Sequence, residues 1–347
     1  MLKSNYLDKK SFIDLNKVDV EKLVKEVGEK KFRINQINNW IYNHFVETWS
    51  EMINLPKSLI NQLEKRIRLH PLELIEISGN ETDPTRKFLF KTIKGNKIES
   101  VLMHNNNRTT ICVSSQSGCI LDCNFCATAS MGFLQNLSFS EIIDQVIYLA
   151  SYSNSKITNI VYMGMGEPLM NYRNVMASGL LLKNKMGFGS TRITISTAGI
   201  SSKICQMADD NYKFKLAISL NASNENTRSR IMPITEKYSL SDIMVASNYY
   251  YKKTKKIITF EYVLLKDVND SINDANKLIN LLKKFPCKLN VIPYNEIGGD
   301  YNRPTEETIE AFLSCFESVP FIVTVRWSNG TNINAGCGQL AVKDLHD

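Results

Sequence analysis

The sequence predicts an α/β fold in which parallel strands, joined by helical crossovers, form a barrel or partial barrel. From about residue 109 onward, short β-branched runs alternate with amphipathic helical stretches, and this alternation is typical of parallel strands. Residues 10 to about 70 instead carry apolar side chains at helical spacing. The length of 347 residues fits one large α/β domain with a smaller attachment.

The amino-terminal part is predicted to be helical. Ile34, Ile37 and Ile41 recur at the spacing of one helix face, and a second apolar set follows before the strands begin. We therefore expect a helical accessory domain over residues 1–95 and the barrel, with a carboxyl-terminal cysteine loop, over residues 96–347.

Seven runs in the barrel are expected to be strands, with amphipathic helices between them. Ser138 and Glu141 form a capping-box pattern, Ser271 can cap a second helix, and Pro304 fits the first turn of a third. Because parallel strands bring their carboxyl ends together, residues that follow strands should gather at one end of the barrel. The expected strands are residues 109–113, 158–163, 192–196, 215–220, 257–265, 288–293 and 321–326.

Composition and charge narrow the class of protein. The sequence has no apolar run of the roughly eighteen residues that a membrane helix needs, and its start lacks the apolar core of a secretory signal. We therefore expect a cytoplasmic protein without membrane contact, in which eight cysteines indicate metal binding or catalysis rather than disulfides. The net charge of +7 suits RNA, although many enzymes without such a partner match it. Residues 1–95 carry 17 Lys and Arg against 13 Asp and Glu, and Lys30, Lys31 and Arg33 open one helix, so we expect this domain to help hold RNA.

Three cysteines stand close together as Cys119-x-x-x-Cys123-x-x-Cys126, directly after the first barrel strand. Three thiolates can hold three irons of a 4Fe–4S cluster and leave the fourth iron open to a ligand, as in catalytic metal sites. A structural zinc site would need a fourth ligand, and no second Cys-x-x-Cys pair occurs. A chance group of buried thiols is the remaining alternative. We expect one open cluster in the chain.

The ends of later strands carry small polar residues. The second strand ends in GMGEP, in which glycines let the backbone approach a ligand and a glutamate can accept a hydrogen bond from an ammonium group. Such residues suit the ribose and carboxylate of a nucleoside-like ligand, although each alone fits a helix cap or a turn equally well. The residues expected to contact this ligand are Gly166, Glu167, Ser196, Ser219, Asn221 and Asn295.

Together these motifs resemble the radical S-adenosylmethionine enzymes, and more closely the RlmN family of RNA adenine-C2 methyltransferases. The similar runs, in the family's order, are CVSSQSGC, FCATASMGF, GMGEPLMN, ISTAGI, LAISLNA, IPYN and INAGCGQL. The resemblance covers roughly residues 30–340. It implies a partial (βα)6 barrel, a 4Fe–4S cluster and S-adenosylmethionine. It also implies adenosines of 23S rRNA and of tRNA as substrates, a flavodoxin-type electron donor and a monomeric enzyme.

The resemblance assigns roles to two further cysteines and a glutamate. Cys337 takes a methyl group from one S-adenosylmethionine, and a second is reductively cleaved to a 5′-deoxyadenosyl radical that removes hydrogen from the S-methyl group. The carbon radical adds to C2 of adenine, Glu99 accepts the C2 proton, and Cys112 attacks the sulfur of Cys337 to release the product, leaving a disulfide. Without the resemblance, Cys112 would be interpreted as a small buried hydrophobe and Glu99 as an exposed strand residue.

Departures from the family leave alternatives open. Gly336 stands where the family has alanine, which is expected to loosen the loop, and Asn221 stands where many members have histidine. The related enzymes that methylate C8 share the cluster and both thiols, but Pro168 favours the C2 enzymes. A radical enzyme without methyl transfer would not need Cys112 and Cys337. A non-enzymatic iron–sulfur protein that binds RNA would not cleave S-adenosylmethionine.

Overall fold

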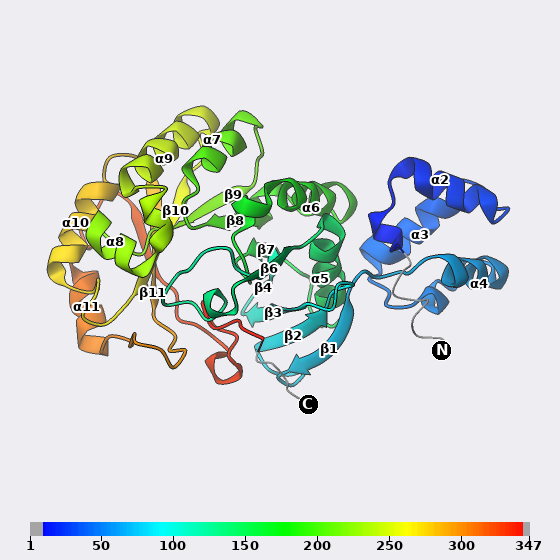
Figure 1. The fold of residues 1–347 in the computed structure, drawn as a ribbon, viewed down its shortest axis with the longest axis horizontal. Coiled ribbons are helices and arrows are strands. Elements are labelled where there is room, and N and C mark those ends of the chain that lie inside the picture. The colour runs from blue at the N-terminus through cyan, green and yellow to red at the C-terminus, as the bar shows by residue number, and fades with distance from the viewer. Residues whose placement is uncertain (1–9, 343–347) are drawn as a thin grey trace.

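The computed structural model describes residues 10–342, and its main feature is a curved ten-stranded sheet (Figure 1). The strand order is β1-β2-β3-β4-β7-β8-β9-β10-β11-β12. From β4 to β12 every neighbouring pair is parallel, whereas β1 to β4 are antiparallel. Within residues 10–342, no helix is long and apolar enough to cross a membrane. The first nine residues of the start, from which no secretory signal was expected, lie outside the described part.

All seven expected barrel strands are confirmed. Six of them form the partial barrel that the resemblance implies, and the last adds a further parallel strand at the edge. The strand positions that face the covering helices are largely apolar and buried, which suits strands covered on one face by helices. The strands are β4 (Arg108–Cys112), β7 (Asn159–Tyr162), β8 (Ile193–Thr197), β9 (Lys215–Ser219), β10 (Ile258–Leu264), β11 (Cys287–Pro293) and β12 (Ile322–Val325).

The helices that cover the barrel begin at the expected caps. Ser138 accepts a hydrogen bond from Glu141 N in a complete capping box, and Ser271 accepts one from Asp274 N. The expectation that Pro304 lies in the first turn of a helix is wrong. Thr305 is the N-cap and the helix begins at Glu306, so the proline precedes the cap. The helices are α5 (Phe139–Ser151), α6 (Tyr172–Lys185), α7 (Ser201–Asp209), α8 (Glu225–Ile231), α9 (Leu240–Thr254), α10 (Ile272–Leu282) and α11 (Glu306–Ser314).

The antiparallel strands were not predicted from the sequence. β1 (Glu73–Ser78), β2 (Thr85–Lys91) and β3 (Lys97–Asn105) extend the barrel sheet, and a short hairpin of β5 (Gln116–Gly118) and β6 (Phe133–Asn136) brackets the cysteine loop. Charged residues interrupt the apolar ones in β1 to β3, which conceals the strand pattern in the sequence. The helices end at Arg66, close to the predicted end near residue 70, and β1 and β2, which precede the expected domain boundary at residue 95, pair in the large sheet.

The helical module lies beyond α5, to one side of the barrel (Figure 1). Its own apolar core includes the fully buried Ile37 and Leu63. His70 connects it to the barrel, because its ring nitrogens lie 2.5 Å from Asp144 Oδ1 on α5 and 3.0 Å from Val46 O. The module contains η1 (Phe12–Asp14), α2 (Lys17–Glu26), α3 (Phe32–Asn43), η2 (Trp49–Glu51) and α4 (Lys57–Arg66).

Candidate active site

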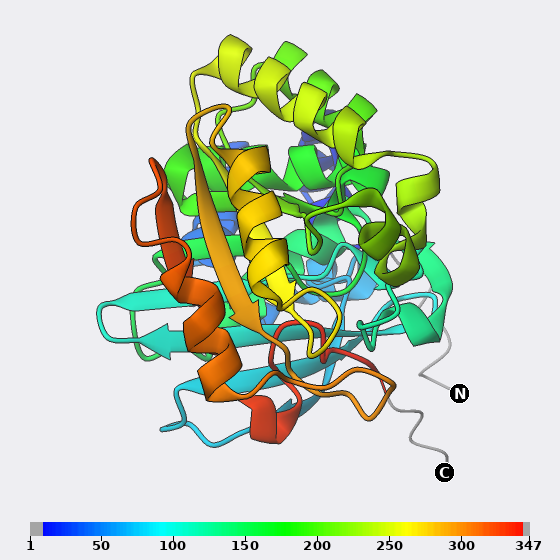
Figure 2. The ribbon, with the colours of Figure 1, turned by 90° about the vertical axis from the view of Figure 1, so that its left-hand side faces the viewer.

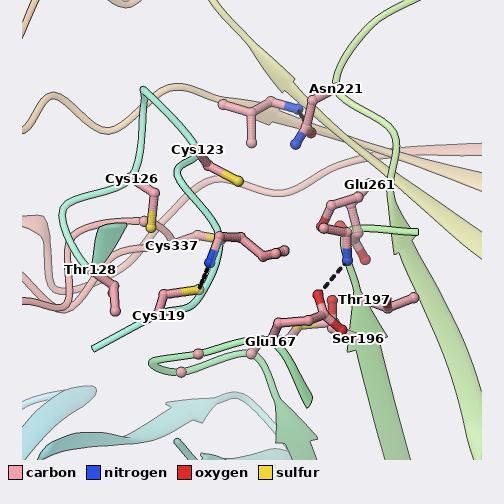
Figure 3. Close-up of a pocket in the computed structure, with 18 of the residues that line it drawn as sticks. Cys119, Cys123, Cys126, Thr128, Glu167, Ser196, Thr197, Asn221, Glu261 and Cys337 are labelled. Carbon is pink, nitrogen blue, oxygen red and sulfur yellow. Dashed lines mark hydrogen bonds between the residues drawn. The ribbon is translucent and has the colours of Figure 1, made fainter. Parts of the chain in front are cut away.

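A pocket opens at the carboxyl ends of the barrel strands, where the sequence predicted the chemistry (Figure 3). Its walls come from the cysteine loop, from the ends of β7 to β12, and from the C-terminal segment, which we define as residues 327–342. The predicted site residues that line it are Cys119, Cys123, Cys126, Gly166, Glu167, Ser196, Ser219, Asn221 and Cys337. Three predicted residues, Glu99, Cys112 and Asn295, do not line it.

The cysteine loop is fixed at both ends by backbone hydrogen bonds. Cys119 N donates to Gly132 O at 2.9 Å, across the base of the β5–β6 hairpin, and Cys126 N donates to Cys123 O at 3.0 Å. Leu121 N lies 3.4 Å from the Cys119 sulfur. In Figure 3 the three sulfurs face the same space.

The donor set fits an iron–sulfur cluster. Burial raises the pKa of Cys119 to about 12 and that of Cys123 well above its ordinary value, and the neighbouring thiols add to both shifts. Three thiolates this close need positive charge at their centre, which a cluster supplies. Across residues 10–342 no three His, Cys, Asp or Glu side chains are arranged to hold a single metal ion. Among multinuclear metal centres, iron–sulfur clusters are the ones that soft thiolate ligands bind.

Glu167 is a buried carboxylate that backbone donors hold in place. Its Oε2 accepts from Ala198 N at 2.7 Å and its Oε1 from Leu169 N at 2.9 Å. Burial raises its pKa to about 7, although these hydrogen bonds and one from Thr197 act in the opposite direction. A cationic ligand group in the pocket would return this carboxyl to its charged form, so Glu167 fits the ammonium partner predicted from the sequence.

The glycines of GMGEP let the backbone lie close to the segment that precedes the cysteine loop. A Cβ on Gly166 would collide with the side chain of Gln116, and one on Gly164 would lie 2.8 Å from Val113 O. Gly166 also lines the pocket, where it was expected to meet a ligand. Gly166 also adopts a φ of 94°, which favours glycine.

Asn221 lines the pocket, but its side chain is already engaged. Its Oδ1 accepts from Val263 N at 2.9 Å, and its Nδ2 lies 3.4 Å from the Met232 sulfur. Ser196 and Ser219 also line the pocket, and within residues 10–342 their hydroxyls form no hydrogen bond, so they are better placed to meet a ligand.

Asn295 holds the C-terminal segment. Its Nδ2 donates to Ser328 Oγ at 2.8 Å and to Cys337 O at 3.0 Å. A Cβ on Gly336 would lie 2.9 Å from this nitrogen and 2.7 Å from Gln339 Oε1. The glycine therefore lets the segment pack tightly, and the expectation of a loosened loop is wrong.

The C-terminal segment is also hydrogen-bonded to the cysteine loop. Ala127 N donates to Gly338 O at 2.8 Å, and Thr128 Oγ1 donates to Leu340 O at 2.6 Å. Figure 2 shows this segment, in red, returning towards the cyan strands β1 and β2. These contacts place the Cys337 thiol next to the cysteine triplet.

Cys112 and Cys337 lie within electrostatic reach of one another and of Arg326. Burial raises the pKa of Cys112 to about 12, Arg326 opposes the shift, and the charge of Cys337 adds to it. Burial also raises the pKa of Cys337, and Arg326 again opposes while Glu261 adds. All eight cysteines are free. Arg326 is thus the group that favours a thiolate at either sulfur.

Glu99 lies in a second cavity, on the other side of the C-terminal segment. Gly338 and Leu340 line the first pocket, whereas Gln339 and Ala341 line the second. Glu99 is buried, which corrects the exposed strand residue that the sequence alone suggested. The segment therefore separates this carboxylate from Cys337.

Lys87 is the partner of Glu99. Its Nζ lies 2.8 Å from Glu99 Oε1, and both side chains are largely buried. The other carboxylate oxygen, Oε2, is buried without a hydrogen bond. Burial raises the pKa of Glu99, and Lys87 and a backbone hydrogen bond from Ala341 oppose this shift.

Sequence reasoning missed three charged residues around the pocket. Glu261 and Arg326 were visible as charges inside apolar strand runs, which is a usable signal. Arg228 gave none. It is fully buried and donates to Leu220 O at 3.0 Å and to Ala198 O at 2.5 Å, so it ties together the loops after β8 and β9.

Comparisons with known proteins decide the family. Residues 113–279 match the radical SAM superfamily, and residues 11–69 match the ribosomal RNA large subunit methyltransferase N-terminal domain. The chain is 44% identical over 95% of its length to a probable dual-specificity RNA methyltransferase RlmN of Clostridium botulinum, of which it covers 96%. The chain belongs to the RlmN family of radical SAM RNA methyltransferases.

Two further relatives agree with this placement. A probable dual-specificity RNA methyltransferase RlmN of Flavobacterium johnsoniae is 39% identical, with 97% of this chain and 99% of the relative covered. The crystal structure of a radical SAM methyltransferase from Sphaerobacter thermophilus is 37% identical and superposes with a TM-score of 0.91, covering 96% of this chain and all of the other. Membership in the RlmN family implies S-adenosylmethionine and an iron–sulfur cluster, which the donor set fits.

Proposed function

We propose that this RlmN-family enzyme methylates C2 of adenosine in 23S rRNA and in tRNA. One observation carries the proposal: Cys337 lines the pocket of the cysteine triplet and lies within electrostatic reach of a second buried thiol, Cys112. A radical enzyme without methyl transfer needs only the triplet. Two more thiols at this place suit a methyl carrier and the group that releases it.

Three thiols would hold the cluster and several polar groups its ligand. Cys119, Cys123 and Cys126 would bind three irons, and the bound cluster supplies the electron that cleaves S-adenosylmethionine. Glu167 would accept from the ligand's ammonium group, and Ser196 and Ser219 would contact its polar edges. The apolar wall of Leu121, Phe125 and Ile292 keeps water away from the reacting carbon.

Cys337 carries the methyl group in this proposal. Adenine C2 is electron-poor and not nucleophilic, so it cannot take a methyl group by simple displacement, whereas a thiolate can. Arg326 favours the thiolate of Cys337 against the effect of burial. Once a carbon bridges Cys337 and C2, the adduct would lose the C2 proton and return its unpaired electron to the oxidised cluster. The Cys112 thiolate would then attack the sulfur of Cys337, so that a disulfide forms as the bond between this sulfur and the bridging carbon breaks. The released carbon takes up a proton, which completes the methyl group, and the product leaves.

Glu99 takes the C2 proton in this proposal. Its unpartnered Oε2 and its raised pKa suit a base that works near neutral pH. Because Gln339 and Ala341 lie between Glu99 and Cys337, the proton transfer requires the C-terminal segment to shift.

The proposal is tested with isotopes. The protein is reconstituted anaerobically with methyl-deuterated S-adenosylmethionine and a rRNA fragment or tRNA, and the nucleosides are analysed by mass spectrometry. We expect C2-methyladenosine that retains two deuteriums from the labelled methyl group, because one is removed as a hydrogen atom. A product with three deuteriums, or no modified base with intact S-adenosylmethionine, would contradict it.

The same experiment separates the C8 alternative. Pro168 at the start of η4 (Pro168–Asn171) favours the C2 enzymes, by resemblance. C8-methyladenosine in the digest would assign the chain to the C8 class instead. A cytoplasmic location, a monomeric state and a flavodoxin-type electron donor remain predictions, which fractionation, light scattering and reduction assays would check.

A further inference from the structure

Four basic residues stand at the opposite end of the barrel from the pocket, where the strands begin. Arg108 opens β4, Arg192 directly precedes β8, Lys215 opens β9, and Lys288 is the second residue of β11. All four side chains are exposed. We call this group the basic mouth.

The alternation of side chains along the strands places the residues of the basic mouth on the face that lines the barrel interior. Side chains alternate along a strand, so residues four apart share a face. Four residues after Arg192 and Lys215 come Ser196 and Ser219, and both line the pocket at the other end. Lys288 is related in the same way to the pocket residue Ile292.

The charges of the basic mouth lie close together and are not neutralised. Burial lowers the pKa of Lys215, and Arg108, Lys288 and Arg192 lower it further. Burial likewise lowers the pKa of Arg108, with Arg326 and Arg192 adding to the shift. None of the four takes part in an ion pair within the described residues. Such a cluster destabilises the free protein and favours an anionic partner.

A row of polar side chains, which we call the polar path, lies between the basic mouth and the pocket. A closed barrel fills its interior with apolar layers, but here several middle positions are polar and at least partly exposed. Thr324 Oγ1 donates to Asn290 Oδ1 at 2.5 Å, and Asn290 Nδ2 donates to Glu261 Oε2 at 2.9 Å. Glu261 lines the pocket. The polar middle residues are Thr110, Thr194, Thr259, Asn290 and Thr324.

The second cavity offers a different approach, with the opposite charge. Its lining includes Glu76 and Glu296 in addition to the paired Lys87 and Glu99. Neither Glu76 nor Glu296 forms an ion pair within the described residues, so both carboxylates repel the phosphates of RNA. Electrostatics therefore favours the basic mouth as the approach for a polyanion.

We propose that the RNA substrate approaches from the basic mouth, where Arg108, Arg192, Lys215 and Lys288 contact its phosphates while the target base extends along the polar path. This inference rests on the proposed function, since it takes RNA as the substrate. Phosphate contacts fix the position of a nucleic acid without reading its sequence, and a base that is modified must leave its stack. The basic mouth supplies the phosphate contacts, and the polar interior of the barrel accommodates the base that has left its stack.

The experiment compares two variants with equal loss of charge. R108Q/R192Q/K215Q/K288Q removes the basic mouth, and the control K183Q/K185Q/K252Q/K277Q removes four exposed lysines of the outer helices α6, α9 and α10. The probe is a fluorescent RNA hairpin with the tRNA anticodon loop, and its binding is measured by anisotropy from 50 to about 300 mM salt.

We expect the mouth variant to bind the hairpin at least about tenfold more weakly. The slope of log affinity against log salt should fall by about three units, at about 0.7 for each lost contact with a single strand, and the control should change little. Thermal melting checks the fold, and if the quadruple variant unfolds, the single substitution Lys215→Gln is used, with an expected slope change below one unit.

Equal losses in both variants, or an unchanged slope in the mouth variant, would overturn the proposal. If hairpin binding is kept but reduction by an acidic electron-transfer protein slows, the mouth binds that protein and the proposal is also overturned. Binding is measured without turnover, so this failure is distinct from failure of the proposed function, which the deuterium experiment tests on the wild-type enzyme.

Discussion

The two ends of the barrel use the same strands for opposite purposes. At the carboxyl end, inward-facing groups are buried and partly neutralised, as the hydrogen-bonded Glu167 and the neighbouring thiols show. At the amino end, Arg108 and Lys215 are exposed and have no ion-pair partner among the described residues. Burial shifts the pKa of the groups that react, whereas exposed charges attract a partner over a distance that the salt concentration limits. The reacting groups therefore lie where the strands end, and the charges that attract a partner lie where the strands begin.

The largest expected effect comes from removing the methyl carrier at the carboxyl end. Cys337→Ala should lower methylation by at least about a thousandfold, because no other thiol lines the pocket outside the cluster triplet. Hairpin affinity should stay within twofold of wild type, roughly the scatter of such binding data. Mass spectrometry of RNA digests and anisotropy measure the two quantities. Cys315→Ala, at the C-cap of α11 and away from the pocket, is the matched control. A parallel loss of RNA affinity would show that the two ends are not separate.

The Lys87–Glu99 pair is expected to have the next largest effect. Lys87→Met keeps the aliphatic stem but leaves Glu99 buried without its partner, so the pKa of Glu99 should rise further. A base works when deprotonated, so the rise of the methylation rate with pH should move to higher pH, with a rate about tenfold lower at neutral pH. The exposed Lys91→Met on the same strand is the control. A lower rate with an unmoved pH profile would mean that Lys87 has a structural role only.

A change at the junction between the helical module and the barrel should affect the stability of the protein without affecting either the pocket or the basic mouth. Burial lowers the pKa of His70, but Asp144 outweighs this and the net pKa is raised above 6.5. The stabilisation is therefore complete below pH 6.5 and is lost as pH rises through the higher pKa of the folded state. Chemical unfolding of wild type should therefore give a lower free energy of unfolding above that interval than below it. His70→Gln should show no such step, and a step of equal size in both proteins would contradict the assignment.

The smallest effect is expected from the basic residues of the helical module. Lys31 is paired with Glu21 at 2.9 Å and Arg33 with Glu29 at 3.2 Å, so these two cations are neutralised where those of the basic mouth are not. K31Q/R33Q should weaken hairpin binding by less than about threefold, since each cation already has a partner. A loss of affinity as large as that of the mouth variant would mean that the helical module holds the RNA, as the sequence predicted. A deletion to test the module should end before β1, because β1 and β2 belong to the barrel sheet.

Motifs whose meaning is local were predictable from the sequence. The cysteine triplet follows β4 as expected, and the capping residues Ser138 and Ser271 begin their helices as expected. Cap geometry and ligand spacing involve only a few neighbouring residues, so the sequence displays them directly. The antiparallel strands were missed because charged residues interrupt the short apolar runs of β1, whose strand form depends on its pairing with β2.

By itself, the sequence determined the family, the order of the barrel strands, and which thiols could hold a cluster. Only the tertiary structure decided which of these groups meet. It placed Asn295 against the C-terminal segment, paired Glu99 with Lys87 in a separate cavity, and brought Arg326 near Cys112 and Cys337. These contacts join residues far apart in the chain, and their energies depend on burial and on the charges packed around them, which no local pattern records.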